Sequence, residues 1–344
     1  MLELIDIVYS YDEKPLLNGV SFKLEDNEVL SLLGPSGSGK STILRIIAGF
    51  ETPVSGSVLY NDRNIMNDPV YKRNFGMVFQ DYALFPHMNV YENIAFGLRL
   101  KKLTGVELDK TIKSALKQVG MESFSERRVT ELSGGEQQRV ALARTLVVKP
   151  SIIMLDEPLG ALDYSLRQSL IEELKSLLGR NGLSAIYVTH DQNEALSLSD
   201  KIAILHEGRI LQIDSPEKLY ARPADKWCAN FLGFHNFVRN RIIESDGLYI
   251  CNFDEKVKIG SFDSPTGTIP EILLKDGKIS FERPDTVLDF SLTAIPEKSI
   301  YRGDYYDIEL KINDMDSVKM KSKTKLSLGQ PVQIFYQKDD YILY

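Results

Sequence analysis

The sequence is poor in cysteine and contains no long hydrophobic run. Its two cysteines, Cys228 and Cys251, exclude a disulfide framework and fit a reducing compartment. We expect both to be small buried residues. No segment approaches the ~18 consecutive apolar residues of a membrane helix, and the first residues lack the pattern of a secretory signal. Any role at a membrane is therefore expected to come through a partner protein.

An excess of positive charge is also missing. The chain has 41 basic and 48 acidic residues, a formal net charge of −7. This balance argues against a surface built broadly to attract nucleic acid or acidic lipid. The length of 344 residues and the hydrophobic content of 43% are sufficient for two domains with their own cores.

The first two thirds of the chain alternate strand-like and helix-like segments. Apolar residues at helical spacing predict helices at TILRIIAGF, from Val90 to about Val129, at GEQQRVALARTLVV and at SLRQSLIEELKSLLGRNG. Short apolar runs predict strands at LELIDIVYS, VSFKL, EVLSLLG, SGSVLY, FGMVFQ, SIIMLDEP and SAIYVTH, followed by a hairpin at KIAILHEGRILQID. This alternation predicts an α/β fold with a parallel sheet covered on both sides.

The pattern changes near Gly233. Short strand-like segments such as LYICNF, GKISFE, YDIELKI and PVQIFY then follow, with almost no helical signal. The sequence therefore predicts a second, all-β domain of small barrels or barrel-like sheets. The segment from Phe237 to Tyr344 has 18 acidic and 15 basic residues, so it is acidic as well.

A glycine-rich segment follows the strand EVLSLLG and precedes a helix. It matches the spacing G-x-x-x-x-G-K-[ST], in which glycines let backbone N–H groups surround a phosphate. Lys40 is expected to reach the β- and γ-phosphates of a nucleotide, and Ser41 to offer its hydroxyl to Mg²⁺. The residues expected to hold ATP here are Gly34, Pro35, Ser36, Gly37, Ser38, Gly39, Lys40, Ser41 and Thr42.

Two carboxylates end the apolar strand Ile152–Leu155. Asp156 is expected to orient Mg²⁺, and Glu157 to polarise the water that attacks the γ-phosphate. A strand that ends in Asp-Glu is a weak signal alone, because a solvated strand end looks the same. Its combination with a phosphate loop favours the catalytic interpretation.

The stretch LSGGEQQR, from Leu132 to Arg139, carries the most specific resemblance. Together with GPSGSGKST and IIMLDE it resembles the signature, Walker A and Walker B motifs of ATP-binding-cassette (ABC) ATPases. The resemblance covers about Met1 to Gly233 and implies a P-loop NTPase fold with ATP and Mg²⁺ as cofactors. It implies a nucleotide-binding domain at 1–234, a helical subdomain at about 88–150 within it, and a regulatory β-domain at 235–344.

In that family the signature faces the ATP of a second copy in a head-to-tail dimer. The resemblance thus assigns Ser133, Gly134 and Gly135 to ATP binding in trans. A hydroxyl, exposed backbone N–H groups and a helix N-terminus suit an anion. A plain N-cap requires only the serine and leaves the two glycines unexplained. The resemblance also places Asp163 across the interface, although Asp163 could equally cap the helix that follows.

Three further positions match the family pattern. Tyr11 resembles the aromatic residue that stacks on adenine, although a core tyrosine is an alternative. Gln80 resembles a glutamine that contacts Mg²⁺ and senses the γ-phosphate, and a solvated strand end is its alternative. His190 resembles the histidine that bonds the γ-phosphate and holds the attacking water. The expected catalytic set is Glu157, His190, Lys40 and Gln80, and the expected Mg²⁺ ligands are Ser41, Gln80 and Asp156.

The segment after Gln80 is apolar although it reads as a loop. Tyr82–Met88 is expected to dock two integral-membrane permease subunits, as this region does in the family. Ordinary core packing is the alternative. These partners imply a homodimer at the cytoplasmic face of the cell membrane, with an extracytoplasmic solute-binding protein as an indirect partner and no nucleic acid.

The β-rich tail resembles the TOBE domain, an oligonucleotide-binding-like fold of importer ATPases. The segments that carry this are ISFERPDTVLDF, YRGDYYDIELKI and LGQPVQIFYQKDDYILY. The tail favours an importer, and the junction FLGFHNFVR resembles that of ATPases which serve iron(III), molybdate or tungstate, or polyamines. The cargo expected first is an inorganic ion, iron(III) or a molybdate-like or tungstate-like oxyanion. Polyamine or sugar import is the alternative for the same motor.

Two other classes of function were weighed. A soluble ABC protein acting on nucleic acid or ribosomes would usually have a coiled-coil insertion, two cassettes or a basic surface. The single phosphate loop and the negative charge argue against it. A regulatory ATP sensor without turnover would not require both Glu157 and His190. The sequence therefore predicts a transport ATPase.

Overall fold

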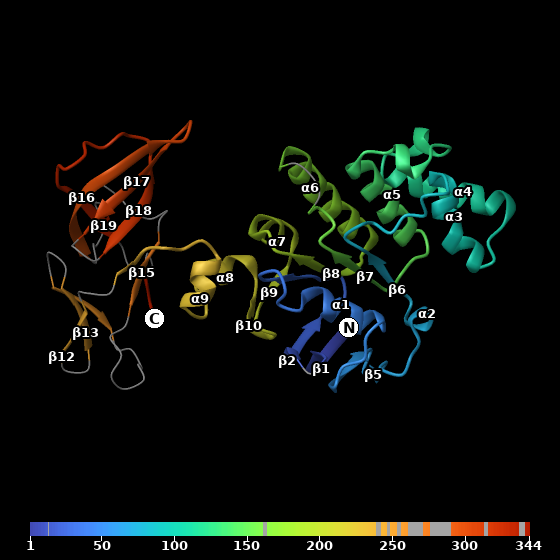
Figure 1. Cartoon of the computed structure of the whole chain (residues 1–344), viewed down its shortest axis with the longest axis horizontal. Helices are drawn as coiled ribbons and strands as arrows, with labels where there is room; N and C mark the ends of the chain where they lie inside the picture. Colours follow the sequence, from blue (N-terminus) through green and yellow to red (C-terminus); the bar gives the residue numbers. More distant parts are fainter. Residues whose placement is uncertain are drawn as a thin grey trace. The chain divides into compact units, whose positions relative to one another are not determined.

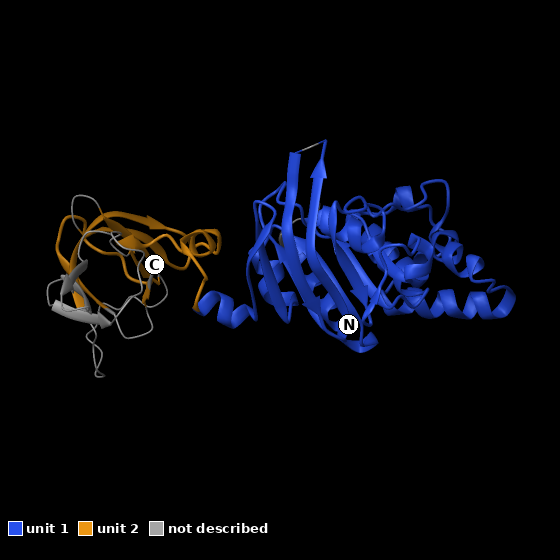
Figure 2. Cartoon of the chain, turned by 90° about the horizontal axis from the view of Figure 1, so that it is seen from below, with its two compact units in different colours: residues 1–221 blue, residues 222–344 orange. Residues whose placement is uncertain are grey.

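The computed structural model describes residues 1–12, 14–160, 164–238, 242–245, 248–252, 256–260, 271–275, 290–312, 316–336 and 341–344. The chain forms two compact units, Met1–Ala221 and Arg222–Tyr344 (Figure 2). The expected boundary at 234/235 lies 13 residues further on than this division. The short helix α9 (Lys226–Phe231) explains the difference, because Lys226 pairs with Glu271 of unit 2.

A six-stranded sheet forms the centre of unit 1. Its strand order is β10-β9-β3-β8-β7-β6, parallel from β9 to β6, with β10 antiparallel to β9. The strands are β3 (Val29–Leu33), β6 (Phe75–Val78), β7 (Ile152–Asp156), β8 (Ser184–Thr189), β9 (Lys201–His206) and β10 (Arg209–Asp214). The three central strands β3, β7 and β8 are buried along their whole length, which explains their continuous apolar sequences.

A second, antiparallel sheet covers one face of the first. It contains β1 (Leu2–Tyr11), β2 (Lys14–Leu24), β4 (Ser55–Tyr60) and β5 (Arg63–Asn64), in the order β2-β1-β4-β5. Helix α1 (Lys40–Ala48) contributes to the same core, which also includes Leu4, Leu32 and Met154. The predicted coverage of the parallel sheet on both faces is confirmed, but one cover is largely a sheet.

Helices cover the other face and extend beyond β6 (Figure 1). Leu170 and Leu174 of α6 (Tyr164–Asn181) pack with Ala141 and Leu142 of α5 (Gly134–Leu146) in one core. A separate core joins α5 to α3 (Val90–Leu100) and α4 (Gly105–Gln118). The remaining elements of unit 1 are α2 (Val70–Arg73), α7 (Gln192–Leu198), α8 (Pro216–Ala221) and two 3₁₀ turns, Glu122–Phe124 and Val129–Glu131.

Apart from α9, the described elements of unit 2 are strands, as the sequence predicts. One sheet has the order β18-β17-β16-β19, and two three-stranded sheets have the orders β11-β15-β20 and β12-β13-β14. Their bounds are β11 (Phe237–Val238), β12 (Ile242–Ser245), β13 (Leu248–Asn252), β14 (Lys256–Gly260), β15 (Ile272–Leu274), β16 (Phe290–Tyr301), β17 (Tyr306–Lys311), β18 (Ser317–Ser322), β19 (Val332–Tyr336) and β20 (Tyr341–Leu343). Most of the segment ISFERPDTVLDF lies outside the described residues.

Among the described helices, none combines the length and the apolar character that a membrane crossing requires.

Candidate functional site

The phosphate loop lies where the sequence predicts it, between β3 and α1. A Cβ added at Gly34 would lie 2.2 Å from the carbonyl oxygen of Leu205, so only glycine allows the loop this close to β9. Gly37 and Gly39 have φ values of +80° and +104°, in the region that favours glycine. The glycines therefore shape the loop by close approach and by backbone conformation, as the motif requires.

Lys40 is buried beneath this loop. Its Nζ donates hydrogen bonds of 2.9 Å to the carbonyl oxygens of Gly34 and Pro35. Burial lowers the pKa of Lys40, while the nearby carboxylates of Glu157 and Asp156 oppose that shift. Two carbonyl groups of the phosphate loop therefore hold the Lys40 side chain in place beneath that loop.

The acidic end of β7 joins the loop. The Ser41 hydroxyl donates a 2.7 Å hydrogen bond to Asp156 Oδ1, which connects the start of α1 to the end of β7. Burial raises the pKa of Asp156; the bond from Ser41 opposes this shift and neighbouring Glu157 adds to it. Burial and Glu157 thus disfavour the charged form of Asp156, and a bound cation would add to the opposing effect of Arg45 and Lys40.

Glu157 lies between two other candidate catalytic residues. Its Oε1 is 3.9 Å from Lys40 Nζ, and its Oε2 is 3.3 Å from His190 Nδ1. Glu157 has a φ of +44°, unusual for a residue with a Cβ. Its N–H donates to the Val188 carbonyl and its own carbonyl accepts from Gly160 N–H, so main-chain bonds on both sides hold this strained conformation.

The turn that carries His190 is fixed by residues that the sequence analysis did not single out. Asp191 caps α7 by accepting hydrogen bonds from the N–H groups of Asn193 and Glu194. The buried Glu194 carboxylate accepts from the hydroxyls of Tyr187 and Thr189, which flank Val188 at the end of β8. The sequence signal was available, because an Asp followed three residues later by Glu is a common helix start.

The loop is suited to ATP and Mg²⁺. The hydroxyl oxygen of Ser38 is buried and has no hydrogen-bond partner among the described residues. A buried polar atom of this kind normally has a partner, and a phosphate oxygen would provide one. Ser41 and Asp156 offer oxygen atoms, the ligands that Mg²⁺ prefers. Ser38 therefore suits the phosphates of ATP, and the pair Ser41–Asp156 suits Mg²⁺.

Among the described residues, no hydrogen bond or ion pair joins Gln80 or Tyr11 to the cluster around Glu157. Gln80 is exposed, two residues beyond the end of β6. Tyr11 ends β1 with 43% of its surface exposed and packs edge-on against Tyr9, at 4.9 Å between ring centroids. Tyr11 is therefore not a core residue, and an aromatic face remains accessible there.

The signature residues lie at the start of α5, as predicted. Ser133 and Gly134 are exposed, and Gly135 is buried. Glu136 accepts hydrogen bonds from Ser133 N–H at 2.7 Å and from the Ser133 hydroxyl at 2.8 Å, and these bonds lower the pKa of Glu136. The Ser133 hydroxyl thus interacts with its own helix and makes no contact with the phosphate loop of the same chain. Asp163 lies outside the described residues.

The segment Tyr82–Met88 divides into a buried and a surface part. Tyr82 is buried and donates a hydrogen bond to the Pro158 carbonyl, so the prediction that it lies on the docking surface is wrong. Phe85 is only partly buried and its ring lies 4.8 Å from that of Phe96, which is 40% exposed. Pro86 and His87 are exposed. We call Phe85, Pro86, His87 and Phe96 the aromatic surface.

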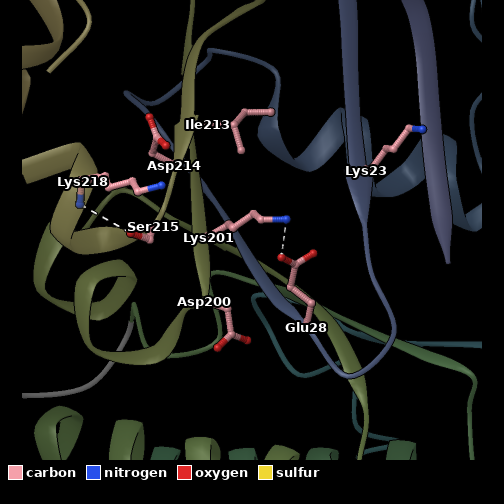
Figure 3. A pocket seen from close by; sticks show the side chains of 8 residues that line it. All are labelled: Lys23, Glu28, Asp200, Lys201, Ile213, Asp214, Ser215 and Lys218. Carbon is pink, nitrogen blue, oxygen red and sulfur yellow. Dashed lines mark hydrogen bonds and ion pairs between the residues drawn. The ribbon is translucent and has the colours of Figure 1, made fainter. Parts of the chain in front are cut away.

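A hollow of about 550 Å³ lies at another place in unit 1 (Figure 3). Its charged side chains are three lysines and three carboxylates, namely Lys23, Lys201, Lys218, Glu28, Asp200 and Asp214. Lys201 pairs with Glu28 at 2.7 Å. Because the charges balance and the phosphate loop does not line it, this hollow is not the nucleotide site.

A family model matches the part of the chain that contains most of the site. Residues 17–160 match the model of the family described as "ABC transporter". This range contains the phosphate loop, the signature and the acidic end of β7.

Comparison with curated proteins gives relatives along nearly the whole chain. The spermidine/putrescine import ATP-binding protein PotA of Mycoplasma capricolum is 46% identical over 337 residues, covering 97% of this chain and 94% of the relative. The protein of the same name from Fusobacterium nucleatum is 38% identical, covering 99% and 94%.

Solved structures show the same fold. The cbiO1 protein of Clostridium perfringens, described as part of an ABC transporter complex, is 30% identical with a TM-score of 0.61, covering 67% of this chain and 94% of that one. A bacterial ABC transporter cassette solved as a dimer is 33% identical with a TM-score of 0.57, covering 63% and 99%. A post-hydrolysis dimer bound to ADP and phosphate has a TM-score of 0.58 and 32% identity, covering 63% and 99%.

Proposed function

Since this chain belongs to the family of ABC transporter ATPases and is an importer-type ATPase that uses ATP and Mg²⁺, we propose that it drives the uptake of a polyamine. In this proposal it is a peripheral subunit at the cytoplasmic face of the membrane, bound to permease subunits. The observation that carries the catalytic part is the cluster in which Glu157 lies between Lys40 and His190, beside the linked pair Ser41–Asp156.

Each residue of the cluster has a distinct task. Lys40 and the N–H groups of the phosphate loop bind and orient the terminal phosphates, with Ser38 as an additional donor. Ser41 and Asp156 hold Mg²⁺, which neutralises charge that develops on the phosphates. Glu157 Oε2 accepts a proton from the attacking water, and His190 positions that water and the γ-phosphate. On the family resemblance, Gln80 is assigned to Mg²⁺ and the γ-phosphate, and Tyr11, which is 43% exposed, to the adenine ring.

Two copies assemble head to tail in this proposal. Ser133 and Gly134 are exposed at a helix N-terminus and leave their own phosphate loop without contact, which suits a role toward another copy. The Gly134 N–H and the Ser133 hydroxyl would bind the γ-phosphate held by the other copy, and the family resemblance assigns Gly135 and Asp163 to the same contact between copies. The helix end contributes ~0.3–1 kcal/mol and charge-assisted hydrogen bonds ~1.5–3 kcal/mol each. Association therefore depends on bound nucleotide.

The aromatic surface is the proposed permease contact. Arg144 lies 5.5 Å from the Phe85 ring centroid and donates to the carbonyl oxygens of Tyr82 and Ala83. Arg144 belongs to α5, the helix that begins at the signature. Through this contact, a shift of α5 on dimer closure would be passed to the aromatic surface and from there to the permease.

The cargo prediction changes. The expected inorganic ion finds no support, because the relatives that cover nearly the whole chain are spermidine and putrescine importer subunits. The polyamine alternative is the better supported one. An ATPase subunit does not contact the transported molecule, so its motifs carry no direct signal for the cargo.

Uptake by the assembled system tests the proposal. The chain is reconstituted with a permease and a solute-binding protein of a spermidine/putrescine import system. Uptake of labelled spermidine is compared with that of labelled molybdate in right-side-out vesicles or proteoliposomes that contain ATP. We expect spermidine uptake that is lost in Glu157→Gln. Molybdate uptake without spermidine uptake would refute the cargo, and uptake that persists in Glu157→Gln would refute the motor.

The permease contact has its own test. Phe96→Ser should leave the ATPase activity of the isolated subunit near the wild-type level, because Phe96 is remote from the phosphate loop in sequence and half exposed. It should lower transport and permease binding. Phe50→Ser is the matched control, since Phe50 is 51% exposed and outside the aromatic surface. Equal loss of transport in both variants would count against the assignment.

A further inference from the structure

Gln138 is an unusual residue in the first half of α5. Its side chain is 1% exposed, yet neither Nε2 nor Oε1 has a hydrogen-bond partner among the described residues. Buried amides almost always have partners, so an amide with both polar atoms unpaired requires an explanation. The motif interpretation of LSGGEQQR assigned no task to this glutamine.

Apolar side chains and three polar side chains surround Gln138. A cavity of about 30 Å³ lies beside it, lined by Gln118, Val119, Gln138, Arg139, Leu142, Leu170, Glu173, Leu174 and Leu177. Leu170, Leu174 and Leu177 come from α6, so the amide faces the seam between α5 and α6. Arg139 donates to the Val119 carbonyl at the end of α4 at 3.1 Å, and across the seam to Glu173 of α6 at 2.7 Å. The seam is thus incompletely packed around the Gln138 amide.

A seam of this kind stabilises the observed packing of α5 against α6 only weakly. An unpaired buried amide disfavours a packing arrangement by a factor of about 5 to 150, and an unfilled cavity adds to this. A leucine at the same position would fill the space and pack against the leucines of α6. Gln138 therefore lowers the free-energy cost of moving α5 away from its packing position on α6.

The position of Gln138 connects this seam to the signature. Gln138 follows Gly134 by four residues, which is one helical turn, and both belong to α5. A small rotation or slide of α5 along α6 would therefore move Ser133–Gly135 directly.

We propose that Gln138 is a positioning residue that keeps the α5–α6 seam loose, so that Ser133–Gly135 can move to reach the nucleotide of the second copy. This inference rests on the proposed function, in which those residues act in trans. The unpaired amide destabilises the nucleotide-free packing and is relieved when α5 shifts.

Gln138→Leu tests the inference, with Gln138→Met as a second variant if the leucine protein folds poorly. We expect the thermal midpoint of the nucleotide-free full chain to rise by about 2–8 °C. We expect kcat for ATP to fall about tenfold, the KM to stay within about twofold, and ATP-dependent dimerisation to weaken. Leu142→Met, a volume-conserving change in the lining of the same cavity, is the matched control and should leave all four quantities near wild type.

The outcomes are distinguishable. A lower thermal midpoint in both Gln138 variants would show that the amide is satisfied, for example by a bound water, and would overturn the inference. Unchanged kcat and dimerisation in a stabilised variant would overturn it as well. If the wild-type chain itself neither hydrolyses ATP nor pairs in its presence, the proposed function fails instead.

Discussion

Substitution of Gly39 by alanine tests the geometry of the phosphate loop most directly. Gly39 is the N-cap of α1, with φ +104° and ψ 6°. A left-handed conformation costs an alanine about 1–2 kcal/mol relative to glycine. The new Cβ would also lie 2.4 Å from Leu17 Cδ2. Leu17 is completely buried, so its side chain has little room to move, and overpacking adds about 1–3 kcal/mol.

The total is about 2–5 kcal/mol, from the strain and the overpacking together. If the loop keeps its shape, the free energy of unfolding falls by this amount. If the loop relaxes instead, the N–H groups leave their positions and ATP binding weakens. We therefore expect the losses in stability and in ATP binding free energy to add up to that range. Thermal or denaturant unfolding and titration calorimetry with ATP and Mg²⁺ measure the two losses.

Two other glycines provide matched controls. Gly37 has φ +80° but open space around its Cβ position, so Gly37→Ala isolates the backbone strain at about 1–2 kcal/mol. Gly179 has a helical conformation and open space in α6, so Gly179→Ala should stabilise by about 0.5–1 kcal/mol. Wild-type stability together with wild-type ATP affinity in Gly39→Ala would refute the reasoning.

Four further predictions follow from other contacts. Glu157→Gln should lower ATP turnover by about 10²–10³-fold and accumulate an ATP-bound dimer in size-exclusion chromatography; turnover at the wild-type rate would rule out the role of Glu157. Ser133→Ala should weaken ATP-dependent pairing in analytical ultracentrifugation while leaving ATP binding by the monomer nearly intact, and a large loss of monomer binding would contradict the role in trans. The buried Arg73 side chain donates hydrogen bonds to four carbonyl oxygens, those of Asp68, Ile46, Ile47 and Met66. Arg73→Met should therefore lower the free energy of unfolding by about 3 kcal/mol or more. A change below about 1 kcal/mol in denaturant unfolding would be inconsistent with these bonds. Burial raises the pKa of Cys228 to about 12, so the thiol is neutral at pH 8 and should resist iodoacetamide until the protein unfolds; rapid labelling of Cys228 in the native protein, seen by peptide mass spectrometry, would contradict its burial.

The parts of the site that local sequence determines were predictable. The order strand, glycine-rich loop, helix fixes Gly34–Ser41 at the edge of the sheet, and the apolar run before Asp156 predicts a buried strand that ends there. The resemblance to the ABC ATPases singled out His190, and the structure places its Nδ1 3.3 Å from Glu157 Oε2, at the carboxyl ends of neighbouring parallel strands.

Features that depend on tertiary packing were not predictable from local pattern. The local sequence predicted an exposed loop at Tyr82, but the Tyr82 hydroxyl donates a hydrogen bond to the carbonyl oxygen of Pro158, which is 76 residues further along the chain. The antiparallel sheet that covers one face of the parallel sheet pairs β1 with β4, and this long-range pairing leaves no signal in either segment alone. The boundary between the units was expected later because α9 is short and its contacts are made with residues far along the chain.

The bond between Ser133 and Glu136 has a consequence for assembly. The hydroxyl already has a negatively charged acceptor on its own helix, so a phosphate from another molecule must compete with that carboxylate for the same proton. The carboxylate would also repel the arriving phosphate. The association of two copies would then be weaker than their contacts alone suggest. A weaker association favours rapid separation of the two copies after each round of ATP hydrolysis.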